Sequence, residues 1–345
     1  MRFPIFIKTN PIICDIAYFI LRKCNWIEKY YQYFTSVPKL SKYHKNILPK
    51  WYSIKRISIA LTNICNAKCV FCAYPKTIMP KGFLQEQDLN TSILLIKKLN
   101  INMVDLTPTV GDVLLDKNLE LRIDKFYQNN IKIHFTTNLI AAKDFLYDES
   151  FLKKISRINI SLSSLDKDDY FKIYGVDKFD IVFENLCKLL EVCRKLKLKN
   201  KQIPKIFIWF RNSQKPSKII RNSKFKFIKQ YFGENVSLSF TAWMDNWGGV
   251  VTKNDIKGWM RLKPYFKLNK PCVGLSNLSI LQDGKIRLCG CRFKDFENDD
   301  LVVGNVNDNQ EIILNNIKPI ILNFYKGKRP LVCQKCTFYM AEKKS

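Results

Sequence analysis

Between residues 55 and 250, short apolar runs alternate with longer amphipathic stretches, and this alternation is the feature that most restricts the fold. Six runs have the β-branched and aromatic composition of strands: Arg56–Leu61, Asn102–Thr107, Ile131–Thr136, Arg157–Leu162, Lys205–Phe210 and Val236–Phe240. Helical patterns lie between them, chiefly at Asp88–Leu99, Asn118–Gln128, Asp180–Lys199 and Ser223–Phe232. Strands that alternate with helices form parallel sheets. We therefore predict an α/β fold with a partial (β/α)6, TIM-like barrel, whose chemistry lies at the carboxyl ends of the strands.

The two ends of the chain differ from this middle part, so we expect three regions: residues 1–52, 53–250 and 251–345. From Arg2 to Arg56 there are eleven Lys and Arg but only two acids. Apolar residues at helical spacing between Ile13 and Tyr31 predict an amphipathic helix, which either packs on the main domain or lies on a membrane surface. The last region holds five of the twelve cysteines, which suggests a small domain held by a metal cluster.

A formal net charge of +28 predicts attraction to anions, with plain lysine-rich composition as the simpler interpretation. We find no basic motif that favours nucleic acid, so we expect no specific nucleic-acid partner. A small substrate, phosphorylated or sugar-linked, fits the charge. No apolar run is long enough to span a bilayer. The N-terminus lacks a small-residue cleavage site after its apolar stretch, so we expect a reducing, cytoplasmic location.

Three cysteines directly follow the first predicted strand, at Cys65, Cys69 and Cys72. Their spacing, CxxxCxxC, places three thiols in one loop at the mouth of the predicted barrel. Zinc usually takes four ligands in paired arms, and no nearby His or Cys completes such a set. Three thiolates suit an iron–sulfur cluster that leaves one iron open for another ligand.

This motif closely resembles that of the radical S-adenosylmethionine (SAM) superfamily, CxxxCxΦC, in which Φ is aromatic and is Phe71 here. The resemblance implies that Cys65, Cys69 and Cys72 hold a [4Fe–4S] cluster whose fourth iron binds SAM. It further implies reductive cleavage of SAM to a 5′-deoxyadenosyl radical, which abstracts hydrogen from a substrate. It also implies a reducing partner such as flavodoxin or ferredoxin.

Further positions match the superfamily in strand order, over about residues 55–250. Gly111-Asp112 stands in place of its Gly-Gly-Glu turn, which holds the amino group of SAM, although the first Gly is replaced and the Glu is shortened. The resemblance implies further cofactor contacts after strands three, four and five, by Asn138, Ser161, Ser163 and Arg211.

A second set of cysteines lies in the C-terminal region. Cys272 precedes a predicted hairpin with Asp283-Gly284 at its turn and Cys289 and Cys291 at its end, and Cys333 and Cys336 form a CxxC arm. On chemistry alone, a four-cysteine site of this kind can hold zinc.

The layout resembles the auxiliary-cluster domains called SPASM and twitch, with Cys272, Gly284 and Cys289 matching their start. No cysteine follows Cys336, so the shorter twitch form is the better match. The resemblance implies a second [4Fe–4S] cluster on Cys272, Cys289, Cys333 and Cys336, with Cys291 as the alternative to Cys289. Four thiolates saturate such a cluster, so electron transfer is its expected work.

The two expected clusters together favour a two-electron oxidation of a carbohydrate, polyol or similar small substrate. Asp245, just after the sixth strand, is a candidate general base, or it caps a turn. The alternative enzyme is a peptide maturase that acts on a ribosomally made precursor peptide. A third alternative is a membrane-docked or anion-binding protein with structural clusters, against which the Cys65 motif argues.

Overall fold

The structure is a computed structural model that describes residues 13, 15, 16, 30, 33–36, 52–211, 213–233, 236–265, 268–290 and 299–342. Most of the predicted N-terminal helix and the alternative ligand Cys291 therefore lie outside the described residues. Of that N-terminal region, Asp15 accepts a hydrogen bond from the hydroxyl of Ser217 at 2.6 Å, at the start of α9 (Pro216–Arg221). At least this part of the region contacts the barrel.

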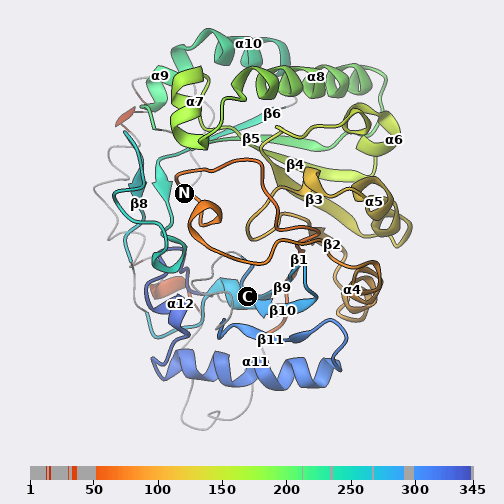
Figure 1. Cartoon of the computed structure of the whole chain (residues 1–345), viewed down its shortest axis with the longest axis vertical. Helices are drawn as coiled ribbons and strands as arrows, with labels where there is room; N and C mark the ends of the chain where they lie inside the picture. Colours follow the sequence, from red (N-terminus) through yellow and green to blue (C-terminus); the bar gives the residue numbers. More distant parts are fainter. Residues whose placement is uncertain are drawn as a thin grey trace.

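A nine-stranded sheet curves around the centre of the molecule, in the order β11-β10-β9-β1-β2-β3-β4-β5-β6 (Figure 1). The six strands from the middle part of the chain are mutually parallel: β1 (Arg56–Ile59), β2 (Met103–Asp105), β3 (Lys132–Thr137), β4 (Ile155–Ser161), β5 (Lys205–Arg211) and β6 (Val236–Thr241). Each coincides with one of the six predicted runs. The predicted α/β barrel with six parallel strands is confirmed.

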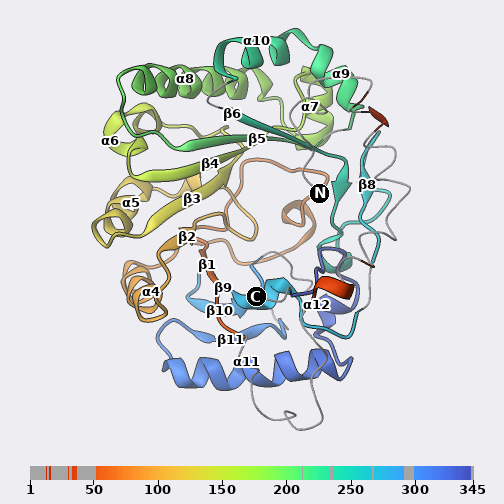
Figure 2. The ribbon, with the colours of Figure 1, turned by 180° about the vertical axis from the view of Figure 1, so that it is seen from behind.

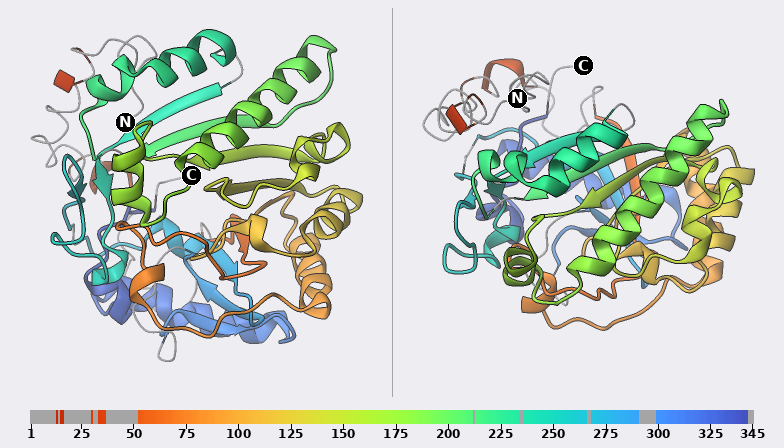
Figure 3. Two further views of the ribbon diagram at one scale, coloured as in Figure 1. Left: turned by 45° about the horizontal axis from the view of Figure 1, so that its top comes forward. Right: turned by 90° about the horizontal axis from the view of Figure 1, so that it is seen from above.

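Helices cover the outer side of the sheet, as the views from behind and from above show (Figures 2 and 3). They are α4 (Glu86–Lys98), α5 (Leu119–Gln128), α6 (Glu149–Leu152), α7 (Lys167–Tyr174), α8 (Phe179–Leu198) and α10 (Ser223–Phe232). The helix-facing side of β5 is apolar: Phe210 is fully buried and lies 5.9 Å, between ring centroids, from Phe225 of α10. Because successive side chains of a strand point to opposite faces, the alternate residues of each strand face the inner side of the sheet.

The C-terminal region continues the same sheet. The predicted hairpin is confirmed as β9 (Asn277–Ile280) and β10 (Lys285–Leu288), and β11 (Val302–Asn305) adds an edge strand that packs against α11 (Gln310–Tyr325). β9 pairs in parallel with β1 over four residue pairs. Two short strands, β7 (Trp243–Met244) and β8 (Arg261–Leu262), and α12 (Leu331–Gln334) complete the mouth of the barrel. Within the described residues, no helix is both long and apolar enough to cross a bilayer.

Candidate functional site

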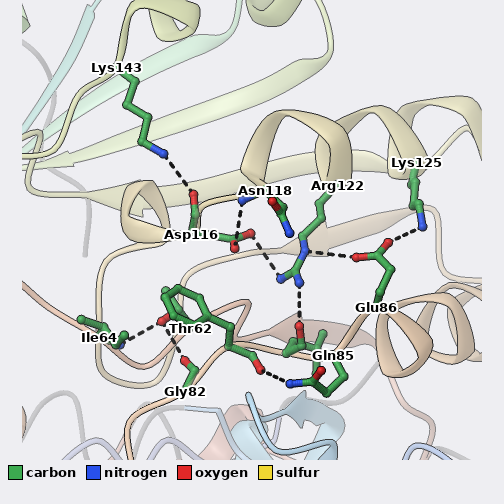
Figure 4. Close-up of polar contacts among 12 residues, drawn as sticks. Thr62, Ile64, Gly82, Gln85, Glu86, Asp116, Asn118, Arg122, Lys125 and Lys143 are labelled. Carbon is green, nitrogen blue, oxygen red and sulfur yellow. Dashed lines mark hydrogen bonds and ion pairs between the residues drawn. The ribbon is translucent and has the colours of Figure 1, made fainter.

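The loop that carries the first three cysteines is fixed at both ends. The Thr62 hydroxyl donates to the Gly82 carbonyl at 2.9 Å and accepts from the backbone N–H of Ile64 at 3.1 Å (Figure 4). The backbone N–H of Leu84 donates to the Leu61 carbonyl at 2.9 Å. The two ends of the loop are thus joined where β1 ends, and the cysteines between them stay at the barrel mouth.

A buried arginine connects this loop to the neighbouring helix. Arg122 of α5 donates to the Leu84 carbonyl at 2.6 Å and pairs with Asp116 at 3.3 Å (Figure 4). A third contact joins Arg122 to Glu86 at 3.5 Å. Breaking a buried ion pair leaves an uncompensated charge, which costs several kcal/mol, so Arg122 fixes the loop firmly against α5.

The three thiols of the first motif lie close together. Burial, together with the negative charges of Asp112 and Cys72, raises the pKa of the Cys65 thiol to about 12. Burial raises the pKa of Cys69 too, with Cys72 and Cys65 adding to the shift and the Arg211 guanidinium opposing it. These mutual effects place the three thiols near one another, and their role as ligands of one cluster stays a prediction.

The turn after β2 lies directly against the cysteine loop. At Gly111, where φ is +122°, a Cβ would lie 2.9 Å from the backbone carbon of Asn63, so only glycine fits. The Asp112 carboxylate is buried and accepts hydrogen bonds from the Thr137 hydroxyl at 2.9 Å and from the Asn138 backbone at 2.7 Å. Asp112 therefore ties the turn after β2 to the turn after β3.

Asn138 lies next to the cysteine loop. Its side-chain amide donates to Asn66 Oδ1 at 2.9 Å, and the same nitrogen is 4.0 Å from the Cys65 sulfur. The structure thus brings Gly111, Asp112 and Asn138 together around Cys65. The fold brings together predicted site residues from three loops: that of Cys65, that of Gly111 and Asp112, and that of Asn138.

Phe71, Ser161 and Arg211 form a second group beside the same cysteines. The Arg211 guanidinium donates to the Ser161 hydroxyl at 2.5 Å and lies 5.0 Å from the centre of the Phe71 ring. Ser163 is fully buried and donates to the Tyr174 hydroxyl at 3.3 Å, and that hydroxyl donates to the Ser161 carbonyl at 2.7 Å. Arg211 is placed to pair with a carboxylate at the barrel mouth, whereas Ser163 is bonded to Tyr174.

The four C-terminal cysteines line one hollow. Cys272, Cys289, Cys333 and Cys336 surround it, although they lie up to 64 positions apart in the chain. The remaining lining is mostly apolar, with Leu275, Leu301, Phe324, Val332, Phe338 and Tyr339. Burial, together with the neighbouring Cys289, raises the pKa of the Cys272 thiol to about 12. A set of four sulfur ligands in an apolar enclosure fits an iron–sulfur cluster or zinc.

The backbone at Cys289 is held in an uncommon conformation. Its φ is +64°, in the left-handed region that non-glycine residues rarely adopt. The fully buried Arg287 donates to the Cys289 carbonyl, and Arg287 itself pairs with Asp299 at 2.7 Å. On the other side, Gly274 leaves room for the thiol, because a Cβ there would lie 2.8 Å from the Cys289 sulfur. These contacts direct Cys289 into the hollow.

Within the part of the chain that the structure describes, no three His, Cys, Asp or Glu side chains converge closely enough to hold a single metal ion. A four-iron cluster is several ångströms wide, so the thiols that bind it stand further apart than those around one ion. The donor sets, three thiols in the first site and four in the second, match an iron–sulfur cluster by their chemistry.

Asp245 lies in the turn after β7. Its Oδ1 accepts from the backbone N–H of Trp247 at 3.0 Å, which is the turn-capping contact that the sequence also allowed. Its role as a general base stays a prediction.

Sequence reasoning missed the inner face of the sheet. Arg157 and Asn159 alternate along β4 with the fully buried Ile158 and Ile160, and Trp209 of β5 is 38% exposed in mid-sheet. The buried Asn159 Oδ1 and Arg157 Nε lack a hydrogen-bond partner among the described residues. The signal was present as polar residues at every second position of an apolar strand, which marks a strand face open to a ligand or water.

Comparisons with known proteins agree with this arrangement. The family described as "Radical SAM superfamily" matches residues 59–208. A probable GTP 3′,8-cyclase of Saccharolobus islandicus (strain Y.N.15.51 / Yellowstone #2) is 30% identical over 140 residues, which are 40% of this chain and 44% of that protein. A GTP 3′,8-cyclase of Clostridium botulinum (strain Hall) is 29% identical over 150 residues, with the same coverage. The chain thus spans less than half the length of the curated relatives it matches.

Among solved structures, that of a hexahistidine-tagged anSMEcpe with bound S-adenosylmethionine superposes with a TM-score of 0.51 and 15% identity. The match covers 84% of this chain and 91% of that one, so it includes the C-terminal region as well as the barrel. At this identity the likeness concerns the fold.

Proposed function

We propose that this chain, whose residues 59–208 match the radical SAM superfamily, is a radical SAM enzyme that removes two electrons from a small polar substrate such as a carbohydrate or polyol. The observation that carries the proposal is the second thiol set, in which Cys272, Cys289, Cys333 and Cys336 face one hollow. With its four thiolate ligands, a cluster there has no open coordination position. Such a cluster would supply electron transfer and would leave substrate binding to other residues.

The proposed reaction balances as follows. The substrate alcohol loses a hydrogen atom from its carbon, a proton from its hydroxyl and one electron, and becomes a carbonyl compound. One electron from the reductant cleaves SAM into methionine and a 5′-deoxyadenosyl radical. This radical takes up the hydrogen atom from the substrate and becomes 5′-deoxyadenosine. The thiols of Cys272, Cys289, Cys333 and Cys336 would hold the group that accepts the electron released by the substrate. The enzyme thus acts as an oxidoreductase and consumes SAM as the oxidant.

The chain's own residues would bind and orient the reactants. Cys65, Cys69 and Cys72 would hold the first cluster, and Arg211 with Ser161 would pair with the carboxylate of SAM. Asn138 would orient the cofactor beside Cys65, close to its sulfur. On the inner face, Asn159 and Trp209 would contact the substrate. An exposed indole and a polar strand surface suit the apolar face and the hydroxyls of a sugar.

Counting iron and sulfide after anaerobic reconstitution tests the two-cluster premise. We expect about eight irons per chain, falling to about four when Cys65, Cys69 and Cys72 are all replaced by Ala. The same fall is expected when Cys272, Cys289, Cys333 and Cys336 are all replaced. Cys187→Ala and Cys193→Ala, both in α8, are matched controls that should keep the full count. About four irons in the wild type, all lost in the first variant, would remove the electron acceptor and refute the oxidation scheme.

The substrate class is tested by isotope transfer. The reconstituted enzyme is incubated with SAM, reductant and polyols that carry deuterium on their alcohol carbons, and 5′-deoxyadenosine is analysed for deuterium. Label in 5′-deoxyadenosine with one carbonyl product per labelled molecule supports the proposal. GTP and a cysteine- or serine-containing peptide form the comparison arms. Label transfer from either of these, and from no polyol, would refute the proposed substrate class.

A further inference from the structure

Three consecutive residues, Asn246, Trp247 and Gly248, contact both cysteine sites, and we call this segment the clasp. It follows β7 at the mouth of the barrel. On one side it reaches the loop of Cys65, Cys69 and Cys72, and on the other it reaches the CxxC arm.

The clasp contacts the first site through Trp247. The indole Nε1 donates to the carbonyl of Phe71 at 2.8 Å, and Phe71 precedes Cys72 directly. Trp247 and Cys72 both pack against a small buried cluster formed by Ala73 and Val110. Trp247 thus holds the last turn of the cysteine loop through both a hydrogen bond and apolar contact.

The clasp contacts the second site through Asn246 and Gly248. The Asn246 amide donates to the Lys335 carbonyl at 2.7 Å, between Cys333 and Cys336, and its backbone N–H donates to the Thr337 hydroxyl at 2.9 Å. The Thr337 backbone donates back to Asn246 Oδ1 at 3.1 Å. At Gly248, a Cβ would lie 2.6 Å from the side chain of Val332, so the backbone lies directly against α12.

The clasp also holds a strained conformation. Trp247 has φ of +51°, in the left-handed region that is a genuine outlier for a bulky residue. Such strain persists only where surrounding contacts fix it, and it concentrates at functional sites. The contacts with Phe71 and with the CxxC arm, together with the hydrogen bond from the Trp247 backbone N–H to Asp245, hold this conformation.

We propose that the clasp is a positioning element that sets the separation and orientation of the two cysteine sites, with Trp247 as its key residue. This inference rests on the proposed function, because it assumes that an electron passes from the substrate to the C-terminal site. A fixed separation matters because the rate of electron transfer falls steeply with distance. The indole lies against one site and its neighbours lie against the other, so a looser clasp would let the two sites move apart.

The test compares Trp247→Phe, which keeps an aromatic ring but loses the N–H donor, with the wild type. Trp259→Phe is the matched control. The backbone N–H of Trp259 donates to the carbonyl of Ser213, and the substitution keeps this backbone hydrogen bond. With both clusters loaded and reduced, we expect Trp247→Phe to keep its iron content and to show altered magnetic coupling between the clusters by EPR. Product formed per 5′-deoxyadenosine should fall several-fold. Unchanged coupling and an unchanged product ratio would overturn the proposal.

A second measurement uses the metal-free chain, so it does not depend on the proposed function. Alkylation of Cys333 and Cys336 by iodoacetamide, followed by mass spectrometry, reports how often the CxxC arm opens. Asn246→Ala and Trp247→Phe should each raise these rates about 3- to 10-fold, as expected for the loss of a hydrogen bond that holds the arm. Cys193 of α8 is the internal reference and should react at an unchanged rate. Equal rates in variants and wild type would refute the clasp, whereas a failed iron count would refute only the proposed function.

Discussion

At the scale of single residues, Asp112 illustrates how a predicted site residue acquires a different set of contacts. The resemblance to the radical SAM superfamily implied that its carboxylate holds the amino group of SAM. In the structure, both oxygens already accept hydrogen bonds, from the backbone of Leu114 and Asn138 and from the Thr137 hydroxyl. We infer that Asp112 orders the two turns beside Cys65, so it contributes to stability as well as to the site.

Replacing Asp112 by Asn tests this role. An amide has one acceptor oxygen instead of two, and its NH2 group would face the backbone donors of Leu114 or Asn138. Leaving a buried donor unsatisfied costs about 1–3 kcal/mol, so we expect the free energy of unfolding to fall by that amount in urea titrations of the metal-free protein. Asp166→Asn is the control, because Asp166 caps the N-terminus of α7 and Asn caps helices equally well. A variant as stable as the control would contradict this assignment.

At the scale of elements, the strands were predictable and the C-terminal helix was not. Runs such as Lys205–Phe210 combine alternation with β-branched and aromatic residues, and these local signals survive folding. The α11 helix contains Pro319, which as a sequence signal indicates a break. The helix forms regardless, because one of its faces is apolar and packs against β11. The buried residues of this face include Ile313, Ile317 and Ile321, and their packing outweighs the cost of the proline.

Pro319 lies on the exposed side of α11, so its replacement removes a cost without removing a core contact. Pro319→Ala restores the backbone donor to the helix, and we expect it to raise the free energy of unfolding by about 1–3 kcal/mol. Lys318→Ala, one position earlier on the same helix, should change it little. Thermal or urea unfolding of the metal-free variants measures both. A destabilised Pro319→Ala protein would mean that the proline has a structural role that the helix geometry does not show.

At the scale of the whole molecule, residues that are far apart in the sequence lie in contact in the fold. The spacing of Cys65, Cys69 and Cys72 sufficed to predict one site, and the hairpin suggested the other. No local pattern could show that β9 pairs with β1, about 220 positions earlier, or that the Trp247 indole reaches the Phe71 carbonyl. These contacts are long-range, and they decide the geometry of the site. The composition change near residue 250 therefore falls within one continuous sheet.

A continuous sheet predicts that the barrel and the C-terminal region unfold together. Ile57 and Ile59 of β1 are almost fully buried. Because β9 pairs with β1, loss of β9 would make β1 an exposed edge strand. In the metal-free protein, the buried thiols Cys193, in α8, and Cys336, in the CxxC arm, should therefore become reactive at the same urea concentration. Alkylation across a urea series, read by mass spectrometry, measures both midpoints in one sample. A clearly lower midpoint for Cys336 would mean that the C-terminal region is a separate cooperative unit, since the β1–β9 pairing would then be too weak to couple the two regions.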